Sequence, residues 1–188
     1  MGWNGHGESV FFGTHLRASE YSSVAAVFAY LKREHGLPGE LFDPSTLHFT
    51  ICDMGAPRKL RESLISALLK AGDLVRTPAF HATLTRAAGF ANGSRGFPNV
   101  LLCDELSTAA FQGLNRAVAV GQLHQGLVAP TRYTPHLTMT RSSSHWLFEG
   151  SVPPIGIEID KLLLIHSYHD GKRRHEVLGQ WPLLKLAA

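Results

Sequence analysis

Apolar and polar residues alternate with a period of two in several short segments, which is the pattern of a half-buried β-strand. The strands predicted in this way cover residues 10–16, 47–54, 79–86, 100–103 and 133–140. One long strand is predicted over 155–168. A turn at residues 169–171 then folds the chain back into a last strand over 175–184, which makes a hairpin. Residues 89–98 are predicted to form a loop.

Three segments between these strands carry apolar residues at helical spacing. The first helix is predicted over 19–35 with Ser19 as its cap, the second from Pro57 until Gly72 stops it, and the third over 107–124. Helices and strands are interspersed, and no linker rich in proline, serine or charge divides them. The pattern predicts a single α+β domain over residues 1–188, with residues 1–9 as a loose N-terminal segment.

Composition narrows the functional classes. The chain is 44% hydrophobic and 18% charged, as in an ordinary globular protein, and its two cysteines provide neither a disulfide framework nor a CxxC zinc pair. Its apolar runs are short and no signal peptide is visible, so we expect a cytoplasmic protein without a membrane segment. The net charge of +3 permits a phosphate-bearing ligand without requiring one.

Two similar segments, one in each half of the chain, carry the candidate chemistry. Residues 47–51 read LHFTI and residues 135–139 read PHLTM, and each segment lies on a predicted strand after turn residues. Residues i and i+2 of a strand point to the same face, so His48 shares a face with Thr50, and His136 shares one with Thr138. If the two strands lie side by side or across a cleft, two imidazoles and two hydroxyls converge.

This set of groups suits phosphodiester chemistry. The pKa of imidazole is near 6.5, so a neutral histidine can take a proton from water while a protonated one gives a proton to the leaving oxygen. Each transfer is typically worth roughly 10²- to 10⁴-fold in rate. Threonine hydroxyls can donate to the non-bridging phosphate oxygens. The scheme needs no metal or cofactor. A third HxT triplet begins at His81, which we interpret as an ordinary strand histidine.

The paired segments resemble those of the 2H phosphoesterase superfamily, and in particular the bacterial 2'-5' RNA ligase-like proteins, also described as RNA 2',3'-cyclic phosphodiesterases. Residues 47–55 (LHFTICDMG) resemble the family's LHLTLxFLG segment, and residues 133–141 (YTPHLTMTR) resemble its FxPHLTLxR segment. Residues 162–167 and 177–183 resemble its closing LxLxxS and VLxxWPL segments. The resemblance runs from about residue 10 to residue 184.

The resemblance implies a bilobed, pseudo-two-fold fold in which two antiparallel sheets face a central groove, with helices on the outside. It implies His48 as proton donor, His136 as proton acceptor, Thr50 and Thr138 as phosphate ligands, and Arg141 as a further one. The implied activity opens 2',3'-cyclic phosphates on RNA ends or nucleotides to 2'-phosphates, or joins such ends in reverse. We expect a monomer without a cofactor.

Two other functions remain open. The same scaffold can act on ADP-ribose 1'',2''-cyclic phosphate or on 2'-5' linked oligoadenylate, since the two motifs are shared and the groove walls differ. Alternatively, the chain is an RNA-end binding protein without turnover. Intact HxT pairs at both positions argue against that alternative, because a binding protein needs no matched acid and base.

Four more features bear on the predicted site. Strand parity places Arg141, five residues after His136, on the opposite face unless a strand end or bulge intervenes. Parity also places Cys52 on the His48 face, as a packing residue. Asp53 stands where the family often has an aromatic residue that could stack on a base. Lys172, Arg173 and Arg174 lie at the hairpin turn, where they could attract an RNA backbone. We do not expect His166, His169 and His175 to form a metal site.

Overall fold

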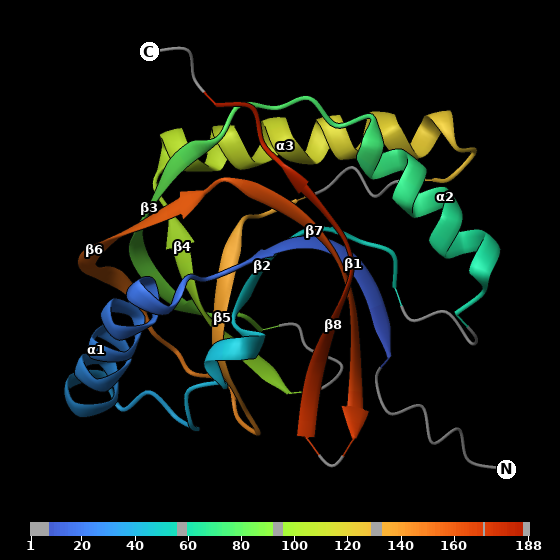
Figure 1. The fold of residues 1–188 in the computed structure, drawn as a ribbon. Helices are drawn as coiled ribbons and strands as arrows, with labels where there is room; N and C mark the ends of the chain where they lie inside the picture. Colours follow the sequence, from blue (N-terminus) through green and yellow to red (C-terminus); the bar gives the residue numbers. More distant parts are fainter. Residues whose placement is uncertain (1–7, 56–59, 92–95, 129–132, 171, 186–188) are drawn as a thin grey trace, which may run out of the picture.

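The computed structural model describes residues 8–55, 60–91, 96–128, 133–170 and 172–185, and Figure 1 shows their arrangement. In chain order the elements are β1 (Ser9–His15), α1 (Ala18–His35), the 3-10 helix η1 (Pro44–Thr46), β2 (His48–Asp53), α2 (Glu62–Asp73), β3 (Phe80–Gly89), β4 (Phe97–Cys103), α3 (Glu105–His124), β5 (His136–Ser142), β6 (Glu149–Ile159), β7 (Lys161–Asp170) and β8 (Lys172–Pro182). Of the segment predicted to be loose, residues 1–7 lie outside the described residues. The α+β class is confirmed.

The named strands form one antiparallel sheet in the order β6-β3-β4-β5-β2-β1-β7-β8. Phe49 of β2 pairs with Leu137 of β5 at the middle of this order, so each half of the sheet has four strands, β5 or β2 included. The prediction of two separate sheets is therefore not confirmed, because the two halves are joined by hydrogen bonding at this junction. The predicted hairpin near the C-terminus is confirmed as β7 and β8.

The long strand predicted over 155–168 is wrong, because the chain turns at Asp160 and forms two strands. β6 pairs with β3 at one edge of the sheet, whereas β7 pairs with β1 and β8 toward the other edge. Arg17, at the start of α1, forms ion pairs with Glu158 and Asp160 beside the turn. This contact comes from a segment more than a hundred residues away, so local alternation carries no sign of it.

The N-terminus of α1 is capped differently from the prediction. The helix begins at Ala18, and Glu20 accepts a hydrogen bond from the backbone N–H of Arg17 at 2.7 Å. Ser19 therefore lies inside the first turn instead of capping it. At the other end, Gly36 adopts a left-handed conformation with φ of 61°, and this ends the helix.

The second helix also differs from its prediction at both ends. It begins at Glu62 and runs one residue past Gly72 to Asp73, while Pro57, where its start was predicted, lies outside the described residues. Gly72 serves packing instead of termination, since a Cβ there would meet the ring of Trp181 at 2.3 Å. The glycine thus lets α2 lie directly on β8.

Each helix covers a different part of the sheet. α1 packs against β6, α2 packs against β7 and β8, and α3 packs against β2, β3 and β4. Figure 1 shows α2 and α3 together at the top of the view, and α1 apart from them at the lower left. In the described part of the chain, no helix is both long and apolar enough to cross a membrane.

Candidate active site

The middle residues of the two HxT segments anchor the site to the core. Phe49 and Leu137 pair with each other across β2 and β5, and both are fully buried. The ring of Phe49 stacks on Phe111 of α3 with ring centroids 4.8 Å apart. Since successive side chains of a strand point to opposite faces, the histidines and threonines beside these two residues face away from the core.

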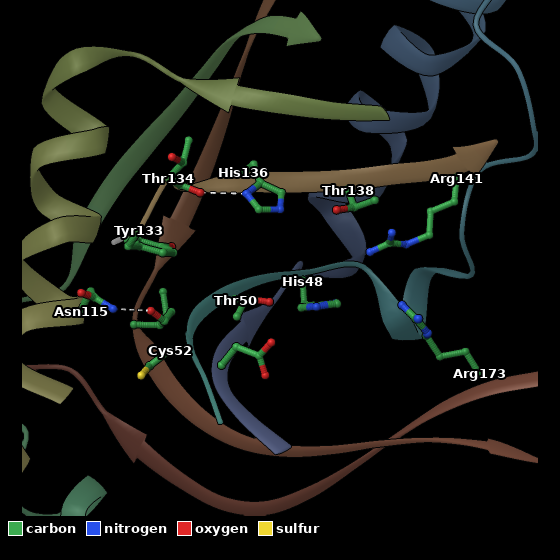
Figure 2. Close-up of a pocket in the computed structure, with 12 residues that line it drawn as sticks. His48, Thr50, Cys52, Asn115, Tyr133, Thr134, His136, Thr138, Arg141 and Arg173 are labelled. Carbon is green, nitrogen blue, oxygen red and sulfur yellow. Dashed lines mark hydrogen bonds between the residues drawn. The ribbon is translucent and has the colours of Figure 1, made fainter. Parts of the chain in front are cut away.

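The four polar residues of the two segments meet at the junction of the half-sheets. Continuing the antiparallel register from the central pair sets His48 opposite Thr138 and Thr50 opposite His136. All four line one pocket of about 370 Å³. Figure 2 shows each histidine beside its own threonine, with the two segments facing each other across the pocket. The structure therefore brings together the residues that lie 88 positions apart in the sequence.

Both imidazoles are held by the same backbone contact. The Nδ1 atom of His48 lies 2.7 Å from the carbonyl oxygen of Thr46, and that of His136 lies 2.8 Å from the carbonyl oxygen of Thr134. A carbonyl oxygen can only accept, so each Nδ1 carries the hydrogen and donates it. The tautomer of each ring is thereby fixed, and each Nε2 is left to take up or give a proton.

The surroundings keep both imidazoles neutral near pH 7. Burial, and to a lesser extent the neighbouring His175, lower the pKa of His48 to about 3. Burial also lowers the pKa of His136, and the positive charge of Arg141 adds to the effect. A bound phosphate supplies the opposite charge, so it raises both pKa values and allows one ring to become protonated.

A β-bulge follows each HxT segment at the same position. Ile51 has no partner where Phe12 pairs with Cys52 and Gly13 with Thr50, and the register between β4 and β5 shifts in the same way at Met139. A bulge inserts one residue into a strand, so it exchanges the faces of the side chains that follow. The local symmetry of the two segments therefore extends past the threonines.

The bulge at Met139 brings Arg141 into the site. Arg141 lines the pocket with the two histidines, and its Nη1 donates to the carbonyl oxygen of Gly96 at 3.3 Å. Uninterrupted strand parity would have placed it on the opposite face. Figure 2 shows its guanidinium at the same end of the pocket as that of Arg173, a hairpin residue that also lines it.

The equivalent bulge at Ile51 turns Cys52 away from the face predicted for it. Cys52 borders the pocket but is only 2% exposed, and its thiol donates to Oε1 of Gln122 at 3.4 Å. Burial raises the pKa of this thiol to about 11, so it is protonated at neutral pH. The interpretation of Cys52 as a packing residue fits this environment, although parity gave the wrong face.

Asn115 and Tyr133 are lining residues that sequence reasoning did not select. Asn115 is buried on α3 and donates from Nδ2 to the carbonyl oxygen of Ile51 at 2.6 Å. Tyr133 lies three residues before His136, and burial raises the pKa of its hydroxyl above the usual range. The motif spacing could have indicated Tyr133, but nothing local indicates that a helix residue reaches the bulge of β2.

Two further histidines stand behind His48. The ring of His175 meets His48 edge-on with centroids 4.9 Å apart, and its Nδ1 lies 3.0 Å from Nε2 of His15. Burial lowers the pKa of His175 to about 4, with His15 contributing.

Among the residues that the structure describes, no group of three histidine, cysteine or acidic side chains is arranged to hold a metal ion. His81 lies exposed on β3 and does not line the pocket.

Comparison with known proteins places this geometry in a known fold. No protein-family model and no curated protein sequence matches the chain. Among solved structures, it is similar to E. coli LigT complexed with NADP+, with 22% identity and a TM-score of 0.69, over 94% of this chain and 97% of that one. The protein TT0787 of Thermus thermophilus matches with 19% identity and a TM-score of 0.66, over 93% and 97% of the two chains.

A more distant match extends the comparison to a phosphodiesterase domain. The MHV ns2 PDE domain is 15% identical, with a TM-score of 0.51 over 81% of this chain and 99% of that one. At such identities the likeness establishes the architecture. The chain therefore has the fold that LigT, TT0787 and the MHV ns2 PDE domain share.

Proposed function

We propose that the protein is a metal-independent RNA 2',3'-cyclic phosphodiesterase that leaves a 2'-phosphate end. The observation that carries the proposal is the matched pair of imidazoles, each held through Nδ1 by a carbonyl and each beside a threonine in one pocket. Solved structures of LigT contain 3'-AMP, phosphate and NADP+, which supports a phosphate-bearing ligand on this fold.

In the proposed reaction, His136 takes a proton from water as the water oxygen attacks phosphorus in line. The bond from phosphorus to the 3'-oxygen breaks, and His48 gives its proton to that oxygen. Thr50, Thr138 and Arg141 stabilise the charge on the non-bridging oxygens. The two imidazoles act as acid and base, and the hydrogen-bond donors stabilise the negative charge on the phosphate. The proposed reaction therefore does not require a metal ion. The reverse reaction joins a cyclic end to a 5'-hydroxyl as a 2'-5' linkage.

The choice of His48 as proton donor follows the family resemblance. Without a bound phosphate, however, the surroundings of His48 disfavour its protonated form. Burial, together with the neighbouring His175 and Arg173, lowers the pKa of His48, so this ring takes up its proton only with the phosphate bound. A substrate with a 3'-sulfur leaving atom tests the assignment, since a thiolate departs without a proton. We expect this substrate to restore turnover in His48→Ala and not in His136→Ala. The opposite result would exchange the two roles.

Phosphorus NMR of a 2',3'-cyclic oligonucleotide tests the activity itself. We expect the wild-type protein to convert the cyclic signal to that of a 2'-monophosphate, and each single histidine variant to lose roughly 10²- to 10⁴-fold in rate. Full activity in either alanine variant would exclude the mechanism. A parallel reaction with EDTA should run at the unchanged rate, and a loss that added metal restores would contradict metal independence.

The same preparation separates the alternatives. ADP-ribose 1'',2''-cyclic phosphate and 2'-5' oligoadenylate are compared with the cyclic oligonucleotide under one set of conditions, and the largest kcat/KM identifies the substrate class. Tight binding of the cyclic oligonucleotide without any product would favour a non-catalytic RNA-end binding protein.

A further inference from the structure

A second pocket adjoins the candidate active site. It has a volume of about 270 Å³ and lies between η1 and the β7–β8 hairpin. Arg173 lines both this pocket and the one that holds the two catalytic candidates, so the two spaces meet at its side chain. In Figure 2 its guanidinium lies at the end of the active-site pocket near His48.

The charges around the second pocket favour an anion. Lys172, Arg173 and Arg174 all line it, together with one carboxylate, that of Asp43. The Asp43 carboxylate accepts hydrogen bonds from the backbone N–H and hydroxyl of Ser45, and these bonds hold its pKa below the usual range. Among the lining residues that the structure describes, three cationic side chains therefore stand against one anionic side chain.

The second pocket is built on parts that also hold the active site. The 3-10 turn η1 contributes Ser45 to this pocket, and the carbonyl oxygen of the next residue, Thr46, accepts the hydrogen bond from His48. The guanidinium of Arg173 lies over the ring of Phe42, 5.7 Å from its centroid. A group bound here is therefore held at a fixed position relative to His48.

We propose that this pocket binds the phosphate on the 5' side of the nucleotide whose cyclic phosphate reacts. The proposal rests on the proposed function and narrows its substrate class to nucleotides that carry a 5'-side phosphate, as every RNA end does. A strand that ends in a 2',3'-cyclic phosphate continues only in the 5' direction. Its next phosphate is therefore the anion that a site adjoining the reacting phosphorus receives.

Three substrates and two double variants test this. The substrates are adenosine 2',3'-cyclic phosphate, the same compound with a 5'-phosphate, and the dinucleotide ApA with a 2',3'-cyclic end. The variant K172Q/R174Q removes two cations from the second pocket and none from the lining of the first. The control R33Q/K70Q removes the same two charges from exposed positions on α1 and α2, outside both pockets.

We expect the wild-type kcat/KM to be higher for the two substrates with a 5'-side phosphate. K172Q/R174Q should lower it for those two by roughly five- to tenfold at low salt, because exposed charge-assisted bonds are weaker than buried ones. Its effect on adenosine 2',3'-cyclic phosphate should stay below twofold, and the control should leave all three values near wild type. The salt dependence of the dinucleotide reaction should also weaken in the variant.

Two results would overturn the proposal that the second pocket binds a 5'-side phosphate: an equal loss of kcat/KM on all three substrates in K172Q/R174Q, or no wild-type preference for a 5'-side phosphate. Neither result would contradict the proposed phosphodiesterase function. Equal loss in the control would reduce the effect to net charge. Absence of turnover on all three would instead count against the proposed function. In that case calorimetric binding of adenosine 2'-phosphate, with and without a 5'-phosphate, decides the second pocket, since the gain in affinity must disappear in K172Q/R174Q.

Discussion

Asn115 of α3 donates a hydrogen bond to the carbonyl oxygen of Ile51, the bulged residue of β2. A bulge leaves one residue out of the ladder, so its carbonyl needs a partner from elsewhere. The side chain of Asn115 is buried and meets that need. The contact ties the helix to the strand one residue after Thr50, and it thereby helps to hold one half of the candidate site.

Replacing Asn115 by alanine should therefore lower both stability and activity. The carbonyl of Ile51 would be buried without a partner, which costs about 1–3 kcal/mol in the free energy of unfolding. We expect urea unfolding to show this loss and kcat to fall more than KM rises, because Thr50 and His48 shift relative to the phosphate. Arg116→Gln, at the exposed neighbouring position, is the control. Unchanged stability in Asn115→Ala would mean that the contact contributes nothing.

The parts of the site that local pattern determines were predicted, and the rest depends on distant contacts. Period-two parity is enough to put each histidine on the face of its threonine. Local pattern does not locate the bulges at Ile51 and Met139, because their carbonyl oxygens accept hydrogen bonds from other elements, from the side chain of Asn115 and from the backbone N–H of Phe42. The faces of Cys52 and Arg141 depend on those bulges, so parity failed at both residues.

The same division applies to the fold. The α+β class, the three helices and the C-terminal hairpin follow from hydrophobic spacing and turn residues. The break at Asp160 and the role of Gly72 depend on Arg17 and Trp181, which are far away in the sequence. The joining of the half-sheets at one pair of residues likewise has no local signal.

The rate should depend on pH in a way that the lowered histidine pKa values fix. The proposed reaction needs one neutral and one protonated imidazole, and both pKa values are below 6.5, that of His48 at about 3. In the free protein the singly protonated pair is then most abundant on the acid side of pH 6.5. We expect kcat/KM to be maximal on the acid side of pH 6.5 and to fall as the pH rises further. The fall in kcat should come at a higher pH than the fall in kcat/KM, because kcat reports the phosphate-bound state, in which the histidine pKa values are raised. A kcat/KM that keeps rising above pH 7 would contradict the acid–base pair.

Stability should fall on acidification through the histidines behind His48. The pKa of His175 is lowered to about 4, below the 6.5 of an unfolded histidine, so the unfolded state binds more protons between these values. The contribution of neutral, buried His175 to the free energy of unfolding is complete above about pH 7. It is lost as the pH falls from 6.5 toward 4. Urea unfolding across this range should show a smaller loss for His175→Gln than for wild type. His81→Gln, at an exposed position, should follow the wild-type curve.

Neither cysteine should take part in the reaction. Burial raises the pKa of Cys52 to about 11 and that of Cys103 to about 12, so both thiols stay protonated at pH 8. We expect iodoacetamide to modify the folded protein far more slowly than the urea-unfolded protein, as mass spectrometry can follow. Cys52→Ala should keep kcat within about twofold, since water is the nucleophile of the proposed mechanism and no protein side chain is. Rapid alkylation of Cys52 with parallel loss of activity would point to a thiol mechanism.

Arg141 should act on the transition state more than on substrate binding. The bulge at Met139 aims its guanidinium at the pocket, and the carbonyl of Gly96 holds it there. Removing a charged donor from a developing phosphorane costs roughly 10²- to 10³-fold in kcat, so Arg141→Gln should show a loss of this size. Arg141→Lys keeps the charge but not the planar fork, and we expect it to restore part of kcat. Single-turnover rates on a 2',3'-cyclic dinucleotide measure both variants. An unchanged kcat with a raised KM in Arg141→Gln would assign Arg141 to ground-state binding alone.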